Sequence, residues 1–276
     1  MVKSLLIRSL SGLVFIAFVV CGLLFHPVPY ALLMLLIIGI VTFEYFQITI
    51  GKKLMLAQVV VVGSGWLLFL LFYALMQYHL KETWFLLLVF PVITVWVSLL
   101  YQKNIENYAQ APNLFIPILY IALPFALTNL LVFDEAGSFH GMALLTLFMV
   151  LWASDVGAYV FGMAFGQKKG HKLFPSLSPK KSWEGFFGGA FMALLVAFIL
   201  HWIGWFSYPL VHCLVISLLL HIFGVWGDLA ESQLKRHYQI KDSGKLMPGH
   251  GGLLDRFDSL LIAFPIVIAY IKFLSL

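Results

Sequence analysis

Long apolar runs with almost no charged residues recur along the whole 276-residue chain. Hydrophobic residues make up 62% of the sequence, and charged residues only 11%. A helix of about 20 apolar residues crosses a bilayer, because each residue adds about 1.5 Å toward a hydrocarbon core of about 30 Å. The runs are continuous and do not alternate between apolar and polar residues, which argues against a β-barrel. The sequence therefore predicts an all-α polytopic membrane protein.

About nine runs are long enough to span a bilayer, with boundaries good to within several residues. They lie at 6–25, 29–50, 56–78, 83–101, 114–133, 140–163, 184–205, 208–227 and 258–276. Several contain Gly or Pro, which membrane helices tolerate better than soluble ones do.

The basic residues predict the orientation of these spans. Of the 17 Lys and Arg residues, only Lys81 and Lys272 fall outside the segments that share a side with the N-terminus. The positive-inside rule then places the N-terminus and the two long loops in the cytoplasm. The net charge of +5 thus reports topology and, in part, an anionic partner, and gives no sign of nucleic-acid binding.

The polar information is concentrated in the second half of the chain. Residues 1–133 read as a transmembrane scaffold of about five spans, and residues 140–276 as a catalytic transmembrane region with cytoplasmic loops at 164–183 and 228–257. The scaffold holds one notable acid, Glu44, in the cytoplasmic half of the second span. An intramembrane acid is a functional candidate by default. Two interpretations stay open for Glu44: contact with a substrate, or simple reach to the headgroup region.

A dense polar stretch, residues 232–258, lies between the last two predicted spans. Gly249, Gly251 and Gly252 surround His250 and allow backbone amides to converge on an anion. No Walker A, GxGxxG or HExxH motif occurs in the chain. The composition of the stretch predicts an anionic, metal-bound phosphate site at a membrane surface.

Carboxylates gather near the cytoplasmic ends of the later spans. Asp155 lies inside the sixth span, Asp228 ends the eighth, and Asp255 and Asp258 open the ninth. A carboxylate in such a position is costly unless it is paired or binds a cation. Mg²⁺ takes oxygen ligands and keeps waters or substrate phosphates in its remaining positions. These acids therefore predict a metal platform, although salt bridges with Lys or Arg stay open as an alternative for any one of them.

The other long loop carries the segment 178–185, Ser-Pro-Lys-Lys-Ser-Trp-Glu-Gly. Ser182 is placed to cap a helix that begins at Trp183, and a helix N-terminus favours anions. Lys180 and Lys181 add positive charge at the same point, and Ser178 adds a hydroxyl. The segment suits a triphosphate or a lipid phosphate. The alternative is a basic loop that sets topology on anionic lipid.

Small residues recur four apart in the spans on either side of this loop. Ala158, Gly162 and Gly166 share one face of the sixth span, and Gly185 and Gly189 repeat the spacing in the seventh. Small residues allow helices to approach closely, so we expect a packing role for them.

The polar stretch resembles the signature of the phosphatidate cytidylyltransferase (CDP-diacylglycerol synthase) family. The matching residues are Ser232-x-Leu-Lys235-Arg236, then Lys241-Asp242-x-Gly244, then Pro248-x-His250-Gly251-Gly252-x-x-Asp255-Arg256-x-Asp258. The segments 154–159 and 178–185 also resemble this family, so the similarity covers roughly residues 150–276. The first half of the chain agrees only in being hydrophobic.

The resemblance implies the reaction CTP + phosphatidate → CDP-diacylglycerol + pyrophosphate, at the cytoplasmic face of the membrane. It implies Mg²⁺ as the cofactor, with K⁺ as a candidate second cation, and a membrane-embedded homodimer. It also implies metal ligands at Asp228 and Asp255.

The chemistry of the reaction assigns further roles to the polar residues. We expect catalytic roles for Asp228, Asp255, Lys241, Arg256 and His250. We expect substrate contacts or support of the metal site from Asp155, Ser178, Lys180, Lys181, Ser182, Lys235, Arg236, Gly251, Gly252 and Asp258.

Two other classes of protein remain as alternatives. A CTP-dependent lipid kinase of the dolichol-kinase type would also place phosphate chemistry on a membrane bundle, but it would not release pyrophosphate or form a CDP-lipid. An ion or lipid transporter would also carry intramembrane acids. The acids here cluster at one predicted surface instead of the bilayer centre, and inverted repeats are not visible.

Overall fold

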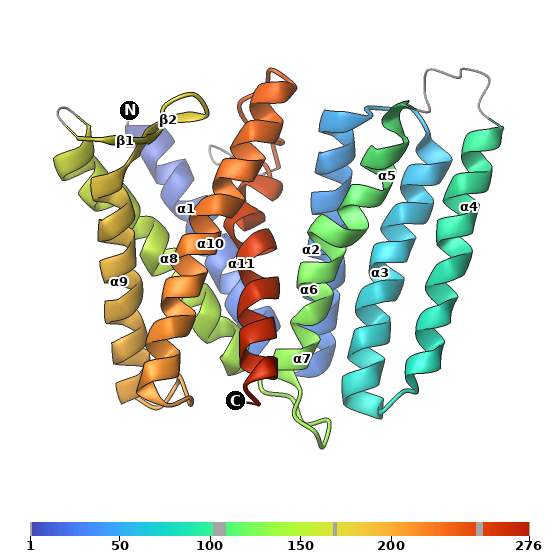
Figure 1. The fold of residues 1–276 in the computed structure, drawn as a ribbon, viewed down its shortest axis with the longest axis horizontal. Helices are drawn as coiled ribbons and strands as arrows, with labels where there is room; N and C mark the ends of the chain where they lie inside the picture. The colour runs from blue at the N-terminus through green and yellow to red at the C-terminus, as the bar shows by residue number, and fades with distance from the viewer. Residues whose placement is uncertain (1, 102–108, 168–169, 247–250, 276) are drawn as a thin grey trace. The chain divides into compact units, whose positions relative to one another are not determined.

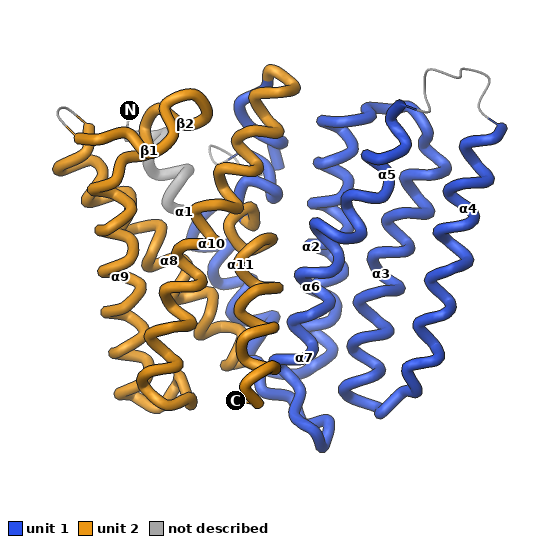
Figure 2. The backbone as a smooth tube through the Cα atoms, viewed as in Figure 1, with its two compact units in different colours: residues 1–141, 240–256 blue, residues 142–239, 257–276 orange. Residues whose placement is uncertain are grey.

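The computed structural model describes residues 2–101, 109–167, 170–246 and 251–275, with side chains from Ser11 onward. The chain forms two compact units (Figure 2). Unit 1 comprises Met1–Gly141 and Ile240–Arg256, and unit 2 comprises Met142–Gln239 and Phe257–Leu276. The division near residue 141 lies close to the predicted division of the chain, but the segment 240–256 belongs with the N-terminal unit.

Unit 1 is a helical bundle in which neighbouring helices are joined by short connections (Figure 1). The second helix begins directly after a turn, where the His26 Nδ1 accepts a hydrogen bond from the Val28 amide and Pro27 occupies the first helical position. Its helices are α1 (Val2–Leu24), α2 (Pro27–Thr49), α3 (Met55–Tyr78), η1 (Glu82–Leu88), α4 (Val89–Leu100), α5 (Ala111–Pro117), η3 (Ile118–Ala122), α6 (Leu123–Leu127) and α7 (Asn129–Val132).

The fifth predicted span of the chain is irregular. A π-helical segment, η3, separates α5 from α6, and it is flanked by Pro117 and Pro124. Proline lacks an amide hydrogen and interrupts the regular helical ladder. Buried polar contacts hold the junction of α6 and α7 further along this span, where the Tyr30 hydroxyl lies 2.7 Å from Thr128 Oγ1 and donates to Asn129 Oδ1 at 3.2 Å.

Unit 2 contains three long helices, most of a fourth and a small hairpin (Figure 1). Strands β1 and β2 pair antiparallel, with Lys172 opposite Ser182 and Phe174 opposite Ser178. This hairpin lies within the predicted loop 164–183 and is a short addition to an otherwise helical fold. The elements are α8 (Gly141–Phe161), η4 (Gly162–Gly166), β1 (Lys172–Phe174), β2 (Ser178–Ser182), α9 (Trp183–Trp202), α10 (Leu210–His237) and α11 (Leu254–Phe273).

The helical part of the polar stretch is longer than the sequence predicted. The loop 228–257 was expected to begin after Gly227, but α10 continues to His237, and α11 already begins at Leu254. The residues after Gly227 are mostly good helix formers, and basic residues in the last turn of α10 suit the negative end of the helix dipole. The connecting segment is therefore 238–253, which is shorter than predicted.

The predicted packing of small residues is confirmed in unit 2. A β-carbon on Gly185 would lie 2.8 Å from the Ala158 carbonyl oxygen and 3.3 Å from the Gly162 Cα. One on Gly189 would lie 3.0 Å from the Ser154 carbonyl oxygen. The start of α9 thus packs against the end of α8 and η4 at backbone distance, as small residues permit.

The described residues include seven helical stretches that are long and apolar enough to cross a membrane. They correspond to the second through eighth predicted spans. The first and last predicted spans are also helical, as α1 and α11, but α11 carries charged residues in its first turn and Lys272 in its last. The chain is thus a polytopic helical membrane protein, and the count of nine spans stays a prediction.

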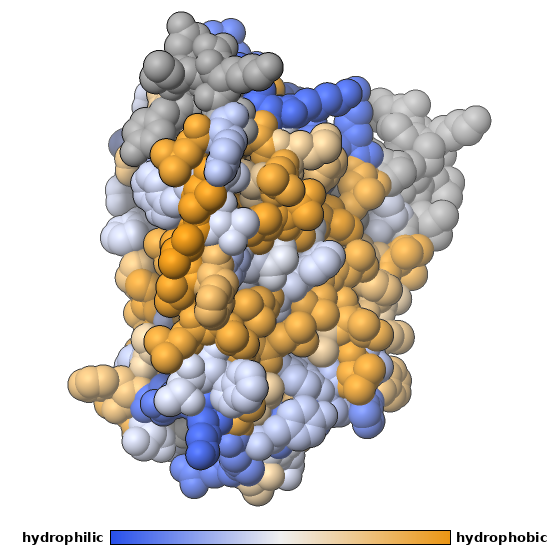
Figure 3. Space-filling model, turned by 90° about the vertical axis from the view of Figure 1, so that its right-hand side faces the viewer, coloured by the Kyte–Doolittle hydropathy of each residue, from blue (hydrophilic) through white to orange (hydrophobic). Residues whose placement is uncertain are grey.

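The surface of the bundle agrees with a lipid environment. In Figure 3 hydrophobic residues cover much of the middle of one face, and hydrophilic residues gather toward its ends. Large apolar side chains that would be buried in a soluble protein are exposed on η1 and α4. They include Trp84, Leu86, Val89, Phe90, Ile93, Trp96, Val97 and Leu100. Contiguous apolar surface of this kind is expected of membrane-facing helices.

The close approach at Gly185 generates a stability prediction. We expect Gly185→Ala to lower the free energy of unfolding by about 1–3 kcal/mol, because the added methyl group meets backbone that cannot move aside. Gly63→Ala in α3 is the matched control, since a β-carbon there has no neighbour within 4 Å. The midpoint of thermal denaturation in detergent measures both. Equal midpoints for the two variants would contradict the packing role of Gly185.

Candidate active site

The hairpin and the start of α9 place two predicted site residues next to each other in unit 2. The Ser182 hydroxyl oxygen accepts a hydrogen bond from the Gly185 amide at 3.2 Å, which confirms the predicted cap of a helix beginning at Trp183. Ser182 is buried, and a β-carbon on Gly166 would collide with its hydroxyl. This contact fixes the end of β2. The preceding residue, Lys181, extends its side chain to the neighbouring helix α10.

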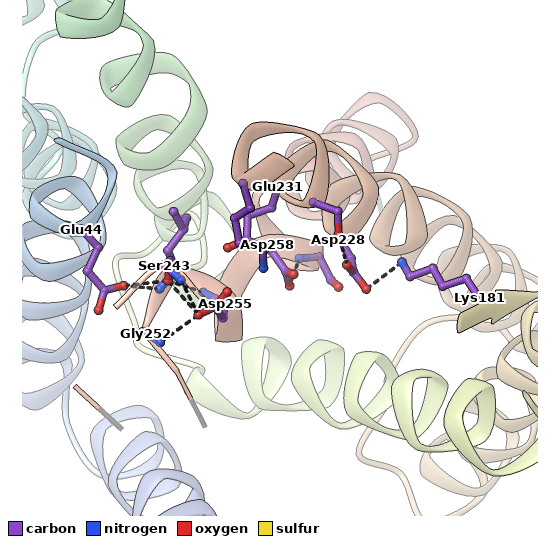
Figure 4. A network of polar contacts seen from close by, with 12 residues as sticks. Glu44, Lys181, Asp228, Glu231, Ser243, Gly252, Asp255 and Asp258 are labelled. Carbon is purple, nitrogen blue, oxygen red and sulfur yellow. Dashed lines mark hydrogen bonds and ion pairs between the residues drawn. The ribbon is translucent and has the colours of Figure 1, made fainter. Parts of the chain in front are cut away.

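Lys181 and Asp228 form an ion pair in which Nζ lies 2.6 Å from Oδ2 (Figure 4). Ser232, one turn further along α10, donates to Asp228 Oδ1 at 3.3 Å. Both charged side chains keep some exposure, 23% for Lys181 and 37% for Asp228. A partly exposed carboxylate with a cation beside it can exchange that cation for a metal ion or share it with a bound phosphate.

Further carboxylates lie around Asp228 in unit 2 (Figure 4). The carboxyl group of Asp258, in the first turns of α11, is repelled by the carboxylates of Asp228, Glu231 and Asp155. Glu231 is fully buried and forms an ion pair with Lys235, four residues along α10. The sequence predicted Asp155, Asp228, Asp255 and Asp258 as a metal platform. Within unit 2, Asp258 interacts electrostatically with Asp155 and Asp228, and the platform itself stays a prediction. Glu231 was not predicted, and its position one turn after Asp228 is the signal that identifies it.

The ammonium group of Lys235 is directed to Glu231 and not to open solvent. Its side chain is only 14% exposed, in contrast to the exposed side chain of Arg236. A cation is needed there, because a buried carboxylate without a partner would be strongly unfavourable. Lys235 was predicted to contact substrate, and the structure gives it a role in balancing the charge of the acid cluster.

The second group of predicted residues lies in unit 1, where Asp255 organises the segment 240–256 (Figure 4). Its Oδ2 accepts hydrogen bonds from the Gly252 amide at 2.8 Å, the Ser243 amide at 2.9 Å and the Ser243 hydroxyl at 2.9 Å. Gly251 has a φ of +86°, and a β-carbon on it would lie 2.6 Å from the same oxygen. The glycines were predicted to direct amides at an anion, and the anion that receives the Gly252 amide is Asp255.

Glu44 of α2 joins this group, although it is about 200 positions away in sequence. Its carboxylate accepts hydrogen bonds from the Leu253 amide at 3.0 Å and the Leu254 amide at 2.8 Å. The Ser243 hydroxyl lies 3.3 Å from Glu44 Oε2. Of the two interpretations of Glu44, reach to the headgroup region does not fit, because the residue is 6% exposed. The intramembrane position of the acid was the only sequence signal for it.

The remaining predicted residues are less engaged in the described contacts. Lys180, Lys241 and Arg256 are exposed, as expected of groups that would meet a phosphate. The Lys180 carbonyl oxygen accepts a hydrogen bond from Gln167 at 3.3 Å. Ser178 begins β2 and is partly buried. His250, predicted to be catalytic, lies outside the residues that the structure describes.

The carboxylate oxygens in unit 2 are chemically suited to bind a hard cation. Carboxylate oxygens are the ligands that Mg²⁺ prefers, and repulsion within the group of Asp155, Asp228, Glu231 and Asp258 favours any bound positive charge. Across residues 2–101, 109–167, 170–246 and 251–275, no three His, Cys, Asp or Glu side chains converge closely enough to form a complete metal site. A metal ion here would therefore keep ligands from water or substrate, as Mg²⁺ commonly does.

Comparison with known proteins extends the resemblance beyond residues 150–276. The model of the cytidylyltransferase family matches residues 6–274. The phosphatidate cytidylyltransferase of Bacillus subtilis (strain 168) is 34% identical over 272 residues, which cover 96% of this chain and 95% of that protein. The phosphatidate cytidylyltransferase of Staphylococcus aureus (strain COL) is 38% identical over 166 residues, 60% of this chain and 61% of that protein. Since the match includes the N-terminal half as well as the polar stretch, this chain belongs to the cytidylyltransferase family.

Proposed function

We propose that the chain is a phosphatidate cytidylyltransferase, which forms CDP-diacylglycerol and pyrophosphate from CTP and phosphatidate. The observation that carries this proposal is the match to the Bacillus subtilis relative of that name over nearly the full length of both proteins. In the reaction, a phosphate oxygen of phosphatidate bonds to the α-phosphorus of CTP. The bond from that phosphorus to the oxygen bridging the α- and β-phosphates breaks, and pyrophosphate leaves with the electron pair.

The charges of the site suit this reaction. The nucleophile is already an anion, so the chemistry needs no strong general base; it needs charge neutralisation and in-line positioning. Lys181, held beside Asp228 at the end of β2, supplies positive charge for a phosphate group. Lys180, Lys241 and Arg256 are exposed cations that we assign to screening of the triphosphate and the lipid phosphate.

We further propose Mg²⁺ as the cofactor, with Asp228 and Asp255 as its protein ligands. When bound, the ion would neutralise charge on the CTP phosphates and on the pyrophosphate leaving group. The carboxylates beside Asp228 support this assignment, and the assignment of Asp255 rests on the family signature. We assign to Asp155 and Asp258 the role of orienting or supplementing the ligands, and their electrostatic interaction in unit 2 supports it. K⁺ as a second cation rests on family resemblance alone.

We place the reaction at the cytoplasmic face of the inner membrane. The support is the distribution of Lys and Arg along the sequence, which follows the positive-inside rule. The site elements of unit 2 agree with a single face, because the end of β2 and the C-terminal part of α10 are joined by the ion pair of Lys181 with Asp228. A homodimer is also part of the proposal and follows from the family resemblance.

The first test is the product of the reaction. Purified protein in detergent, given phosphatidate, labelled CTP and Mg²⁺, is expected to form a labelled CDP-lipid and an equal amount of pyrophosphate. Thin-layer chromatography of the lipid and an enzymatic pyrophosphate assay measure the two products. CDP release with a newly phosphorylated lipid would instead identify a lipid kinase, and absence of any nucleotide turnover would overturn the proposal.

The second test concerns the metal. Removal of divalent ions with EDTA is expected to abolish activity, and added Mg²⁺ to restore it. Asp228→Asn is expected to lower kcat/KM at limiting Mg²⁺ by at least about 100-fold, because it removes a charged ligand where transition-state charge is stabilised. Asp134→Asn, in the loop after α7, is the control and should keep wild-type activity. Near-normal activity of Asp228→Asn at limiting Mg²⁺ would contradict the metal assignment.

The third test separates a phosphate contact by Lys181 from a purely structural ion pair. We expect Lys181→Met to lower kcat/KM by about 100-fold, the loss typical of a deleted electrostatic contact in a transition state. Lys52→Met, which removes an exposed lysine outside the site, is the control. If Lys181→Met kept kcat/KM within about twofold of wild type, the lysine would serve only in a structural ion pair.

A further inference from the structure

We infer that Glu44 is a positioning residue for the reaction: its carboxylate fastens the segment 240–256 by capping the N-terminus of α11. This inference rests on the proposed function, and it concerns a residue in the half of the chain where the sequence showed no interpretable motif. Glu44 lies in α2, and the segment it holds carries Lys241, Asp242 and Asp255.

The Glu44 carboxylate accepts hydrogen bonds from backbone amides at the N-terminus of α11. The first amides of a helix have no partner within that helix, and they carry the positive end of its dipole. The Leu253 and Leu254 amides, at the start of α11, donate to Glu44 Oε1 at 3.0 Å and to Oε2 at 2.8 Å. Both oxygens of one carboxylate are therefore used, and such charge-assisted bonds are about twice as strong as neutral ones.

The burial of Glu44 makes this contact specific. At 6% exposure the carboxylate cannot rely on water, so its charge is stabilised by the donors of the segment. A glutamine in its place would present an amide NH₂ to one of the two backbone N–H groups. Two donors would then face each other, and one hydrogen bond of the cap would be lost.

Two glycines of the signature are matched to the carboxylate. A β-carbon on Gly244 would collide with Glu44 Oε1. One on Gly252 would collide with the Ser243 hydroxyl and lie 2.5 Å from Glu44 Oε2. Neither glycine has a positive φ, so conformational freedom does not explain them. Close approach to Glu44 explains Gly244, and close approach to Glu44 and Ser243 together explains Gly252. The segment is thus shaped around a carboxylate from α2.

The contact continues from Glu44 to Asp255 through Ser243. The Ser243 hydroxyl lies 3.3 Å from Glu44 Oε2 and 2.9 Å from Asp255 Oδ2, and the Ser243 amide donates to the same Asp255 oxygen at 2.9 Å. Glu44 holds the backbone at Leu253 and Leu254, and Ser243 orients the carboxylate of Asp255. Loss of Glu44 would remove an anchor of the backbone that carries the donors of Asp255, and would thereby loosen the orientation of Asp255.

The test compares Glu44→Gln, Glu44→Asp and Thr49→Val in the CDP-lipid assay. We expect Glu44→Gln to lower kcat by about 100-fold with KM for CTP within roughly threefold, because small misplacement of reacting groups costs rate more than binding. Glu44→Asp keeps the charge but is one methylene shorter, and should fall between wild type and Glu44→Gln. Thr49→Val is the matched control, since Thr49 is on the same helix, is 7% exposed and, among the described residues, donates to the Tyr45 carbonyl oxygen of that helix.

Hydrogen exchange of the amides at 251–256, followed by mass spectrometry, supplies a readout that global stability would not move. We expect exchange there to be roughly tenfold faster in Glu44→Gln than in wild type or Thr49→Val, with α3 unchanged. If Glu44→Gln does not fold, Glu44→Asp must show both effects. Unchanged exchange in the Glu44 variants, or kcat within twofold of wild type, would overturn the inference. Absence of CDP-lipid from wild-type protein would overturn the proposed function instead, and exchange would still decide whether Glu44 holds the segment.

Discussion

The balance of carboxylate charge is the constraint on which the polar part of this molecule depends. In a chain with so few charged residues, each buried acid needs donors or a cation close by, because water is not at hand to stabilise it. The structure meets this need in two ways. Asp228 and Glu231 are paired with lysine ammonium groups, whereas Glu44 and Asp255 are surrounded by backbone amides and a serine hydroxyl.

The two ways have different chemical consequences. A lysine side chain is flexible, so an ion pair such as Lys181 with Asp228 can open to admit a phosphate or a metal ion without disturbing the helices. Backbone amides cannot leave without moving the chain, so the contacts of Glu44 and Asp255 fix a conformation. Unit 2 therefore offers exchangeable charge, and unit 1 offers a fixed loop. A phosphoryl-transfer site needs both, since catalysis there is neutralisation of charge combined with positioning.

The sequence was sufficient for features that depend on local pattern. Apolar length predicted the helices, Ser182 marked the start of α9, and small residues four apart predicted the close packing around Gly185. The extension of α10 beyond its apolar run was not predicted. The length of an apolar run indicates where a helix could leave the membrane, whereas α10 extends to His237 because the residues that follow favour a helix. The partners of Glu44 could not be predicted either, because a contact between residues about 200 positions apart leaves no periodic pattern in the sequence.

The glycines of the signature show how one sequence pattern fits more than one anion. Closely spaced glycines and a helix start predict that amides converge on a negative charge, and this physical reasoning was correct. A single sequence cannot say whether that charge is a bound phosphate or a distant carboxylate of the same chain, because both use the same donors. Here the Gly252, Leu253 and Leu254 amides are already committed to Asp255 and Glu44. We therefore propose the cationic side chains, such as Lys181, Lys241 and Arg256, for recognition of the substrate phosphates. The committed amides hold the loop that carries the last two.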